Sequence, residues 1–167
     1  TSLISRSFFP DSVIHCYEPN MNIEKYLAPN SKVANFKYFI EAVGAKTGMV
    51  KLNIDNNQSV LSSISSDETG STRQISFREA LERFGKLNVD IVKMDCEGSE
   101  WEILDKVDLW NNIKFITMEY HLGLNNFDHN RIIRALEKIG FELVSKIENS
   151  QECNYGIAVG YNKNILK

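Results

Sequence analysis

The chain has 167 residues, of which 43% are hydrophobic, a length and composition typical of one globular domain. Its 19 basic and 22 acidic residues give a formal net charge of −3 without any block of like charges, which argues against binding to nucleic acids or membrane surfaces. No apolar run approaches the roughly 20 residues of a membrane-spanning helix. We therefore expect one cytoplasmic domain, residues 1–167, that binds neither nucleic acid nor membrane.

Short apolar runs in the first half of the chain predict strands. A nearly continuous β-branched run predicts a strand over 13–17, and 38–43 predicts a second strand that Gly44 closes. Residues 50–54 alternate between apolar and polar, which is typical of a strand with one wet face. Residues 57–72 contain six serines and few large apolar side chains, so they predict a loop.

Helical and extended patterns alternate in the second half. Two S-x-x-E capping boxes, Ser76 with Glu79 and Ser99 with Glu102, predict helix starts. The remaining predicted elements are strands over 89–94 and 113–118, a helix over 128–139, and strands over 141–147 and 155–161. No helix separates the last two strands, so they should form an antiparallel hairpin at the end of a mostly parallel α/β sheet.

Ligands of open parallel sheets bind at the carboxyl ends of the strands, so polar residues that follow a strand are the candidates for a site. Glu18 follows the first predicted strand, where a carboxylate can accept hydrogen bonds from the two hydroxyls of a ribose. A solvated strand end is the alternative interpretation of this residue.

Two further polar clusters follow the strands over 89–94 and 113–118. Asp95 and Glu97 follow a buried strand, where an unpaired carboxylate is unfavourable unless it lines a polar cleft, so we expect such a cleft there. Glu119 and His121 combine a carboxylate with an imidazole, which suits general-base chemistry or a divalent ion, and a structural role for the histidine stays open. Our primary assignment includes no metal, and a divalent ion held by Asp95, Glu97, Glu119 and His121 is kept as an alternative.

These residues occur in an order that resembles a known family. Residues 17–20 (YEPN), 42–44 (AVG), 90–100 (DIVKMDCEGSE) and 118–121 (MEYH) are similar to the motifs of the FkbM-type methyltransferases. The string lysine-x-aspartate-x-glutamate-glycine-x-glutamate is the most specific of them. The resemblance extends from about residue 9 to residue 161 and implies a Rossmann-like, class I methyltransferase sheet that uses S-adenosylmethionine.

The resemblance also implies roles for individual residues. Glu18 would hold the ribose of the cofactor, and Ala42 and Val43 would lie against the adenine. Asp95 and Glu97 would lie near the methyl donor, and Glu119 and His121 on the acceptor side. The acceptor would be a hydroxyl group of a sugar, glycan or small natural product, with Asp95 and His121 as the candidate bases.

The family's first strand and glycine-rich loop are not matched in this sequence. We therefore expect an amino-terminally truncated domain whose sheet is completed by rearranged pairing or by a partner chain, which allows a homodimer. Cofactor affinity should then be weak or absent. A non-catalytic interaction module with a methyltransferase-like fold is the main alternative, and a nicotinamide-binding domain fits less well because nothing in it requires the string over residues 93–100.

Overall fold

The computed structural model describes residues 1–54, 62–66, 70–85, 88–96, 98–123, 128–148 and 154–166. None of the helices in these ranges is long and apolar enough to cross a membrane. The helices are α1 (Ser2–Phe8), α2 (Glu24–Ala34), α3 (Phe77–Glu82), α4 (Glu100–Leu104) and α5 (Asn130–Lys138), with two 3₁₀ turns at Met21–Ile23 and Val107–Trp110. The strands are β1 (His15–Tyr17), β2 (Lys37–Phe39), β3 (Ala42–Gly44), β4 (Gly48–Ile54), β5 (Ser62–Ser66), β6 (Thr72–Ser76), β7 (Val89–Met94), β8 (Ile113–His121), β9 (Phe141–Glu148) and β10 (Tyr155–Asn162).

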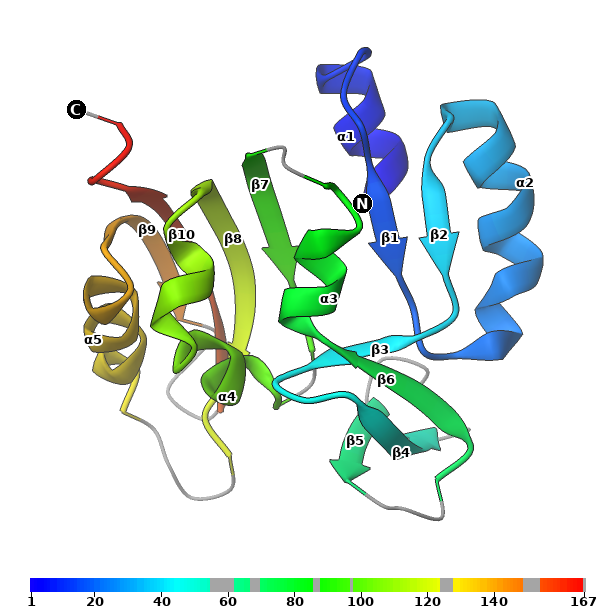
Figure 1. Cartoon of the computed structure of the whole chain (residues 1–167). Coiled ribbons are helices and arrows are strands. Elements are labelled where there is room, and N and C mark those ends of the chain that lie inside the picture. The colour runs from blue at the N-terminus through cyan, green and yellow to red at the C-terminus, as the bar shows by residue number, and fades with distance from the viewer. Residues whose placement is uncertain are drawn as a thin grey trace.

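The described strands form three sheets. One has the order β7-β8-β10-β9, the second consists of β1 and β2, and the third has the order β3-β6-β4-β5. Figure 1 shows β1 and β2 on the side of β7 that faces away from β8, with the third sheet below them. An α/β fold is therefore confirmed, and so is the antiparallel pairing of β9 with β10 at the carboxyl end.

The prediction of a mostly parallel sheet is wrong for the described strands. The pairs β1–β2, β3–β6 and β7–β8 are parallel. The pairs β4–β5, β4–β6, β8–β10 and β9–β10 are antiparallel. One reason is the third sheet, whose strands β5 and β6 were not indicated by the apolar pattern, and another is that β10 pairs with β8 as well as with β9.

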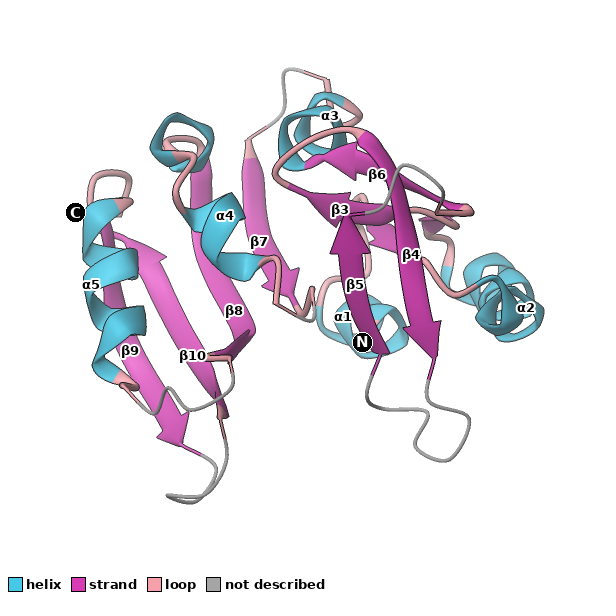
Figure 2. Ribbon diagram, turned by 90° about the horizontal axis from the view of Figure 1, so that it is seen from below, coloured by secondary structure: helices cyan, strands magenta, loops and turns pink. Residues whose placement is uncertain are grey.

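The main core lies between the β7-β8-β10-β9 sheet and the helices α4 and α5, which cover the same face of that sheet (Figure 2). Alternation along β8 buries Ile116, Met118 and Tyr120, each at most 1% exposed. Ile132 and Leu136 are spaced four residues apart on α5 and are completely buried against this face. From Phe115 to His121, the odd-numbered residues of β8 therefore face away from the core.

The strand predicted over 38–43 is two strands in different sheets. The chain changes direction between β2 and β3, at Ile40 and Glu41. The Glu41 carboxylate is only 12% exposed and forms ion pairs with Arg83 (2.6 Å) and Arg73 (3.3 Å). This largely inaccessible carboxylate lies at the bend, and its arginine partners lie far away in the sequence.

The loop predicted over 57–72 is also partly wrong. Ser62–Ser66 is strand β5 and pairs with β4, and Thr72 begins β6, the strand between β3 and β4. Residues 57–61 and 67–69 lie outside the described residues. The sequence of β6 is polar apart from Ile75, which is fully buried, so its strand conformation depends on pairing with both neighbours.

The β1–β2 sheet is not joined to the β7-β8-β10-β9 sheet within the described ranges. In these ranges, β1 pairs with β2 alone, and β7 pairs with β8 alone. The facing edges of β1 and β7 are therefore not joined to each other. The described strands thus do not show the rearranged pairing that we expected. The other expectation, a partner chain such as a second copy, stays a prediction.

Candidate active site

The carboxyl ends of β7 and β8 bring three predicted residues together. The two strands are parallel, and Met94 lies opposite Met118. Asp95 follows the first strand, and Glu119 and His121 end the second on the face opposite to the buried Met118 and Tyr120. One ligand atom each from Asp95, Glu119 and His121 lies within 4.8 Å of the others. We call these three residues the acidic–imidazole group.

Glu100 lies directly behind this group and is completely buried. Its carboxylate accepts the backbone N–H of Cys96 (2.9 Å) and that of Gly98 (2.9 Å), and it lies 3.2 Å from Nδ1 of His121. Buried carboxylates are tolerated where donors surround them. Gly98 has φ +107°, a conformation that favours glycine, and this turn directs its N–H toward the carboxylate.

The capping box predicted for Ser99 and Glu102 is wrong. Ser99 makes no side-chain hydrogen bond to the start of α4, and its backbone is already helical. Glu100 satisfies the backbone N–H groups of the preceding turn instead. The capping box of Ser76 and Glu79, in contrast, is confirmed at the start of α3.

The imidazole of His121 is held from several sides. A carboxylate is acceptor-only, so the contact with Glu100 places a proton on Nδ1 and turns Nε2 toward Glu119, whose Oε1 is 3.6 Å away. Tyr155 stacks on the ring, and the Trp101 indole N–H donates to the His121 carbonyl. The side chain keeps 20% of its surface exposed, so Nε2 lies in a fixed position at the edge of solvent.

The charges around the group are mainly negative. Among the described residues, Lys93 brings a positive charge to the group, with Nζ 2.8 Å from Oδ2 of Asp95, and this pair is about one third exposed. Burial, followed by the charge of Glu100, raises the pKa of the Cys96 thiol to about 12. The thiol is therefore protonated at neutral pH, and Cys96 is not a nucleophile. Glu97 lies outside the described residues.

Of the predicted cofactor residues, Asp95 belongs to the acidic–imidazole group, and the other three lie in or directly after strands of the other two sheets. Glu18 follows β1, where its N–H donates to the Phe39 carbonyl (3.0 Å) and its Oε1 accepts the N–H of Asn20 (2.8 Å). Ala42 and Val43 belong to β3; Ala42 is 1% exposed and Val43 is half-buried against the main core. Figure 1 shows β1, β2 and β7 running in the same direction, so Glu18 and Asp95 follow strands that end at the same edge of the molecule.

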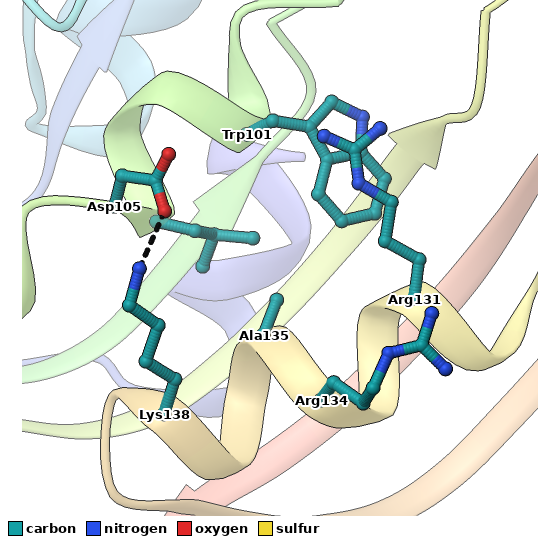
Figure 3. Close-up of a pocket in the computed structure, with 7 residues that line it drawn as sticks. Trp101, Asp105, Arg131, Arg134, Ala135 and Lys138 are labelled. Atoms are coloured by element: carbon teal, nitrogen blue, oxygen red, sulfur yellow. Dashed lines mark hydrogen bonds and ion pairs between the residues drawn. The ribbon is translucent and has the colours of Figure 1, made fainter.

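A surface pocket of about 180 Å³ lies between α4 and α5 and was not predicted from the sequence (Figure 3). Arg131 lies with its guanidinium carbon 3.8 Å from the centre of the Trp101 ring. Lys138 spans the pocket to Asp105 at 2.7 Å. Trp101 therefore connects this pocket, through its ring, with His121, through its indole nitrogen.

Glu100 and Trp101 are the site residues that sequence analysis missed. The glutamate was part of the most specific family-like string, but its role depends on burial and on His121, which is 21 residues away in the sequence. Trp101 follows the predicted helix start at Ser99, and its indole N–H needs a partner when the ring is buried, which was the available signal.

The family model for the methyltransferase FkbM domain matches residues 11–143. The match covers most of the chain, including Glu18, the acidic–imidazole group and Glu100, and the chain belongs to the FkbM methyltransferase family. The family predicted from the sequence is thus confirmed. No curated protein and no solved structure matches the chain significantly.

Proposed function

We propose that the chain is an S-adenosylmethionine-dependent O-methyltransferase that acts on a hydroxyl group of a sugar or another small natural product. The convergence of Asp95, Glu119 and His121 at the carboxyl edge of two parallel strands carries the proposal. The FkbM family assignment supports methyl transfer, and the mixture of carboxylates and imidazole supports an oxygen nucleophile, which has to lose a proton.

Glu18 supports the cofactor assignment. Its carboxylate stands at a strand end, and the N–H of Asn20 fixes its orientation, which suits the two hydroxyls of a ribose. Val43 would contribute an apolar contact to the adenine, while the almost fully buried Ala42 would contribute through the backbone of β3. When bound, S-adenosylmethionine supplies a sulfonium methyl group, which the acceptor oxygen takes as the carbon–sulfur bond breaks.

The side chains of the acidic–imidazole group have complementary tasks. Nε2 of His121 accepts the hydroxyl proton of the acceptor, and Glu100 stabilises the resulting imidazolium through Nδ1–H. Asp95 and Glu119 accept hydrogen bonds from the acceptor and so orient its nucleophilic oxygen. Asp95 is the second candidate base because its carboxylate lies within 4.8 Å of a ring nitrogen of His121 and is partly exposed.

The proposal is tested by transfer of a tritiated methyl group from S-adenosylmethionine to a panel of monosaccharides, glycosides and phenols. We expect transfer to at least one hydroxyl acceptor, and we expect His121→Ala to reduce kcat at least about 100-fold because a positioned base typically contributes that much. Glu102→Gln on the exposed side of α4 is the control. A folded wild-type protein that binds S-adenosylhomocysteine but methylates none of these acceptors would contradict O-methylation, and one that binds no cofactor would favour the interaction module.

A further inference from the structure

The acidic–imidazole group has the composition of a metal site. Two carboxylates and one imidazole suit a first-row divalent ion, and such sites keep positions open for substrate when the protein supplies three ligands. The donor atoms lie within 4.8 Å of one another, whereas ligands around one ion at 2.0–2.2 Å are separated by about 3 to 4 Å. Asp95 and Glu119 are about one third exposed, so small side-chain rotations bring their oxygens to that separation.

Glu100 provides an observation independent of the three donors. Metal-binding histidines typically donate their second ring N–H to a carboxylate, which fixes the tautomer and directs the other nitrogen at the ion. Glu100 is the accepting carboxylate here: it is fully buried, lies 3.2 Å from Nδ1 of His121 and leaves Nε2 on the side of Glu119. A fully buried carboxylate behind a histidine that is only 20% exposed is a costly arrangement for a purely structural residue.

The charges also favour a cation. Asp95 and Glu119 together match the charge of a divalent ion, and Glu100 adds a third carboxylate within contact of His121. Lys93 now satisfies part of this charge through Asp95, in an exposed ion pair of the kind that contributes little to stability. A divalent ion therefore competes with Lys93 for Asp95.

We propose that Asp95, Glu119 and His121 bind one divalent ion of the Mn²⁺ type, with Glu100 as the residue that positions His121. Mn²⁺ accepts both carboxylate and imidazole ligands, and its open positions would take the hydroxyl oxygens of the acceptor. A metal-bound hydroxyl loses its proton more readily, so the ion replaces His121 as the group that activates the acceptor. Ion binding depends on the geometry alone, whereas this role in activation rests on the proposed methyl transfer.

Titration of the purified chain with Mn²⁺, followed by the electron paramagnetic resonance signal of the free ion, tests the inference without any cofactor or acceptor. Mn²⁺ is preferred to Zn²⁺ as the probe because zinc has a high affinity for cysteine thiolates, and the chain also contains cysteines. We expect one bound equivalent in the wild type and affinities weaker by about tenfold or more in Asp95→Asn, Glu119→Gln and Glu100→Gln. Lys93→Gln should bind more tightly, because it removes the competing cation.

Glu102→Gln is the matched control, because it removes one exposed carboxylate from α4 outside the group and should leave the affinity unchanged. If Glu100→Gln fails to fold, the two partly exposed ligands Asp95 and Glu119 still test the site. No saturable Mn²⁺ binding, or binding that survives Asp95→Asn and Glu119→Gln, would overturn the inference. Mn²⁺ binding without methyl transfer would support the metal site and contradict only the proposed function. Methyl transfer that persists in the presence of a chelator would show that the ion takes no part in activating the acceptor.

Discussion

The β7-β8-β10-β9 sheet and the β1–β2 sheet are stabilised in different ways. The first is packed against α4 and α5 through a continuous apolar core, whereas α1, beside β1, contains no buried residue. The β1–β2 sheet is held instead by Arg83, whose guanidinium stacks on Phe39 (4.3 Å) and pairs with Glu41 (2.6 Å). The acidic–imidazole group thus stands on the region that is packed around the apolar core, while Glu18 stands on the region held by polar and aromatic contacts.

The largest expected loss of stability comes from a substitution in the apolar core of the β7-β8-β10-β9 region. Trp110 is fully buried and contacts the rings of Phe77 and Phe141, so Trp110→Ala should reduce the free energy of unfolding by about 3–5 kcal/mol. Val33→Ala, at a position 84% exposed on α2, should change it by less than about 0.5 kcal/mol. Urea unfolding measures both, and Leu136→Ala replaces the tryptophan variant if that does not fold. Equal losses in the two regions would refute the comparison.

The second prediction concerns Glu100, the buried residue that holds His121 in the acidic–imidazole group. Glu100→Gln keeps the shape of the side chain but removes the charge that binds His121. It should lower the free energy of unfolding by about 1–3 kcal/mol, and it should reduce kcat while changing KM less. Glu102→Gln should leave both quantities at the wild-type values. Chemical unfolding and methyl-transfer kinetics check this, and an unchanged kcat would show that His121 does not need Glu100.

The third prediction concerns the contact that holds the β1–β2 sheet. Within the described parts of the chain, Arg83→Ala leaves the Glu41 carboxylate with the exposed Arg73 as its ion-pair partner, so the free energy of unfolding should fall by about 1–2 kcal/mol. Hydrogen exchange should rise in β1 and β2 and stay unchanged in β8. The control is Arg78→Ala, which breaks an exposed pair with Asp108 and should have little measurable effect. Uniformly faster exchange in both sheets would show that they unfold together.

The smallest expected effect is a pH dependence in the β1–β2 region. Burial, followed by the charges of Lys37 and Arg83, lowers the pKa of His15 below its ordinary value of 6.5. Between the lowered pKa and 6.5 the unfolded chain binds a proton that the folded chain does not, so the free energy of unfolding falls as the pH drops through this window. His15→Phe keeps the ring that stacks on Phe84 and should remove this part of the pH dependence. Parallel stability curves for the two proteins between pH 5 and about pH 7 would contradict the assignment.

The sequence predicted the β7-β8-β10-β9 region better than the β1–β2 region, because local sequence patterns determine its strands and helices. The strands β7 and β8 and helix α5 follow from apolar periodicity, and the placement of Asp95 beside Glu119 and His121 follows from the rule that ligands meet strand ends. Strand β6 was missed because its only large apolar residue is Ile75, and its conformation depends on two neighbours.

The remaining errors have a common cause. The bend at Glu41 requires Arg73 and Arg83, and the burial of Glu100 requires His121 together with two backbone N–H groups. Both are carboxylates that a sequence pattern assigns to the surface by default. Each becomes buried only because the fold supplies its partners from distant positions in the chain.

The most direct test of the central claim, that both regions serve one methyl-transfer site, is calorimetric titration of the chain with S-adenosylhomocysteine, comparing the wild type with Glu18→Ala. We predict weak but saturable binding to one site in the wild type and its loss in Glu18→Ala, with the unfolding transition unchanged because Glu18 lies at a half-buried strand end. Absence of saturable binding in the folded wild type, or equal affinity in the two proteins, would contradict the account.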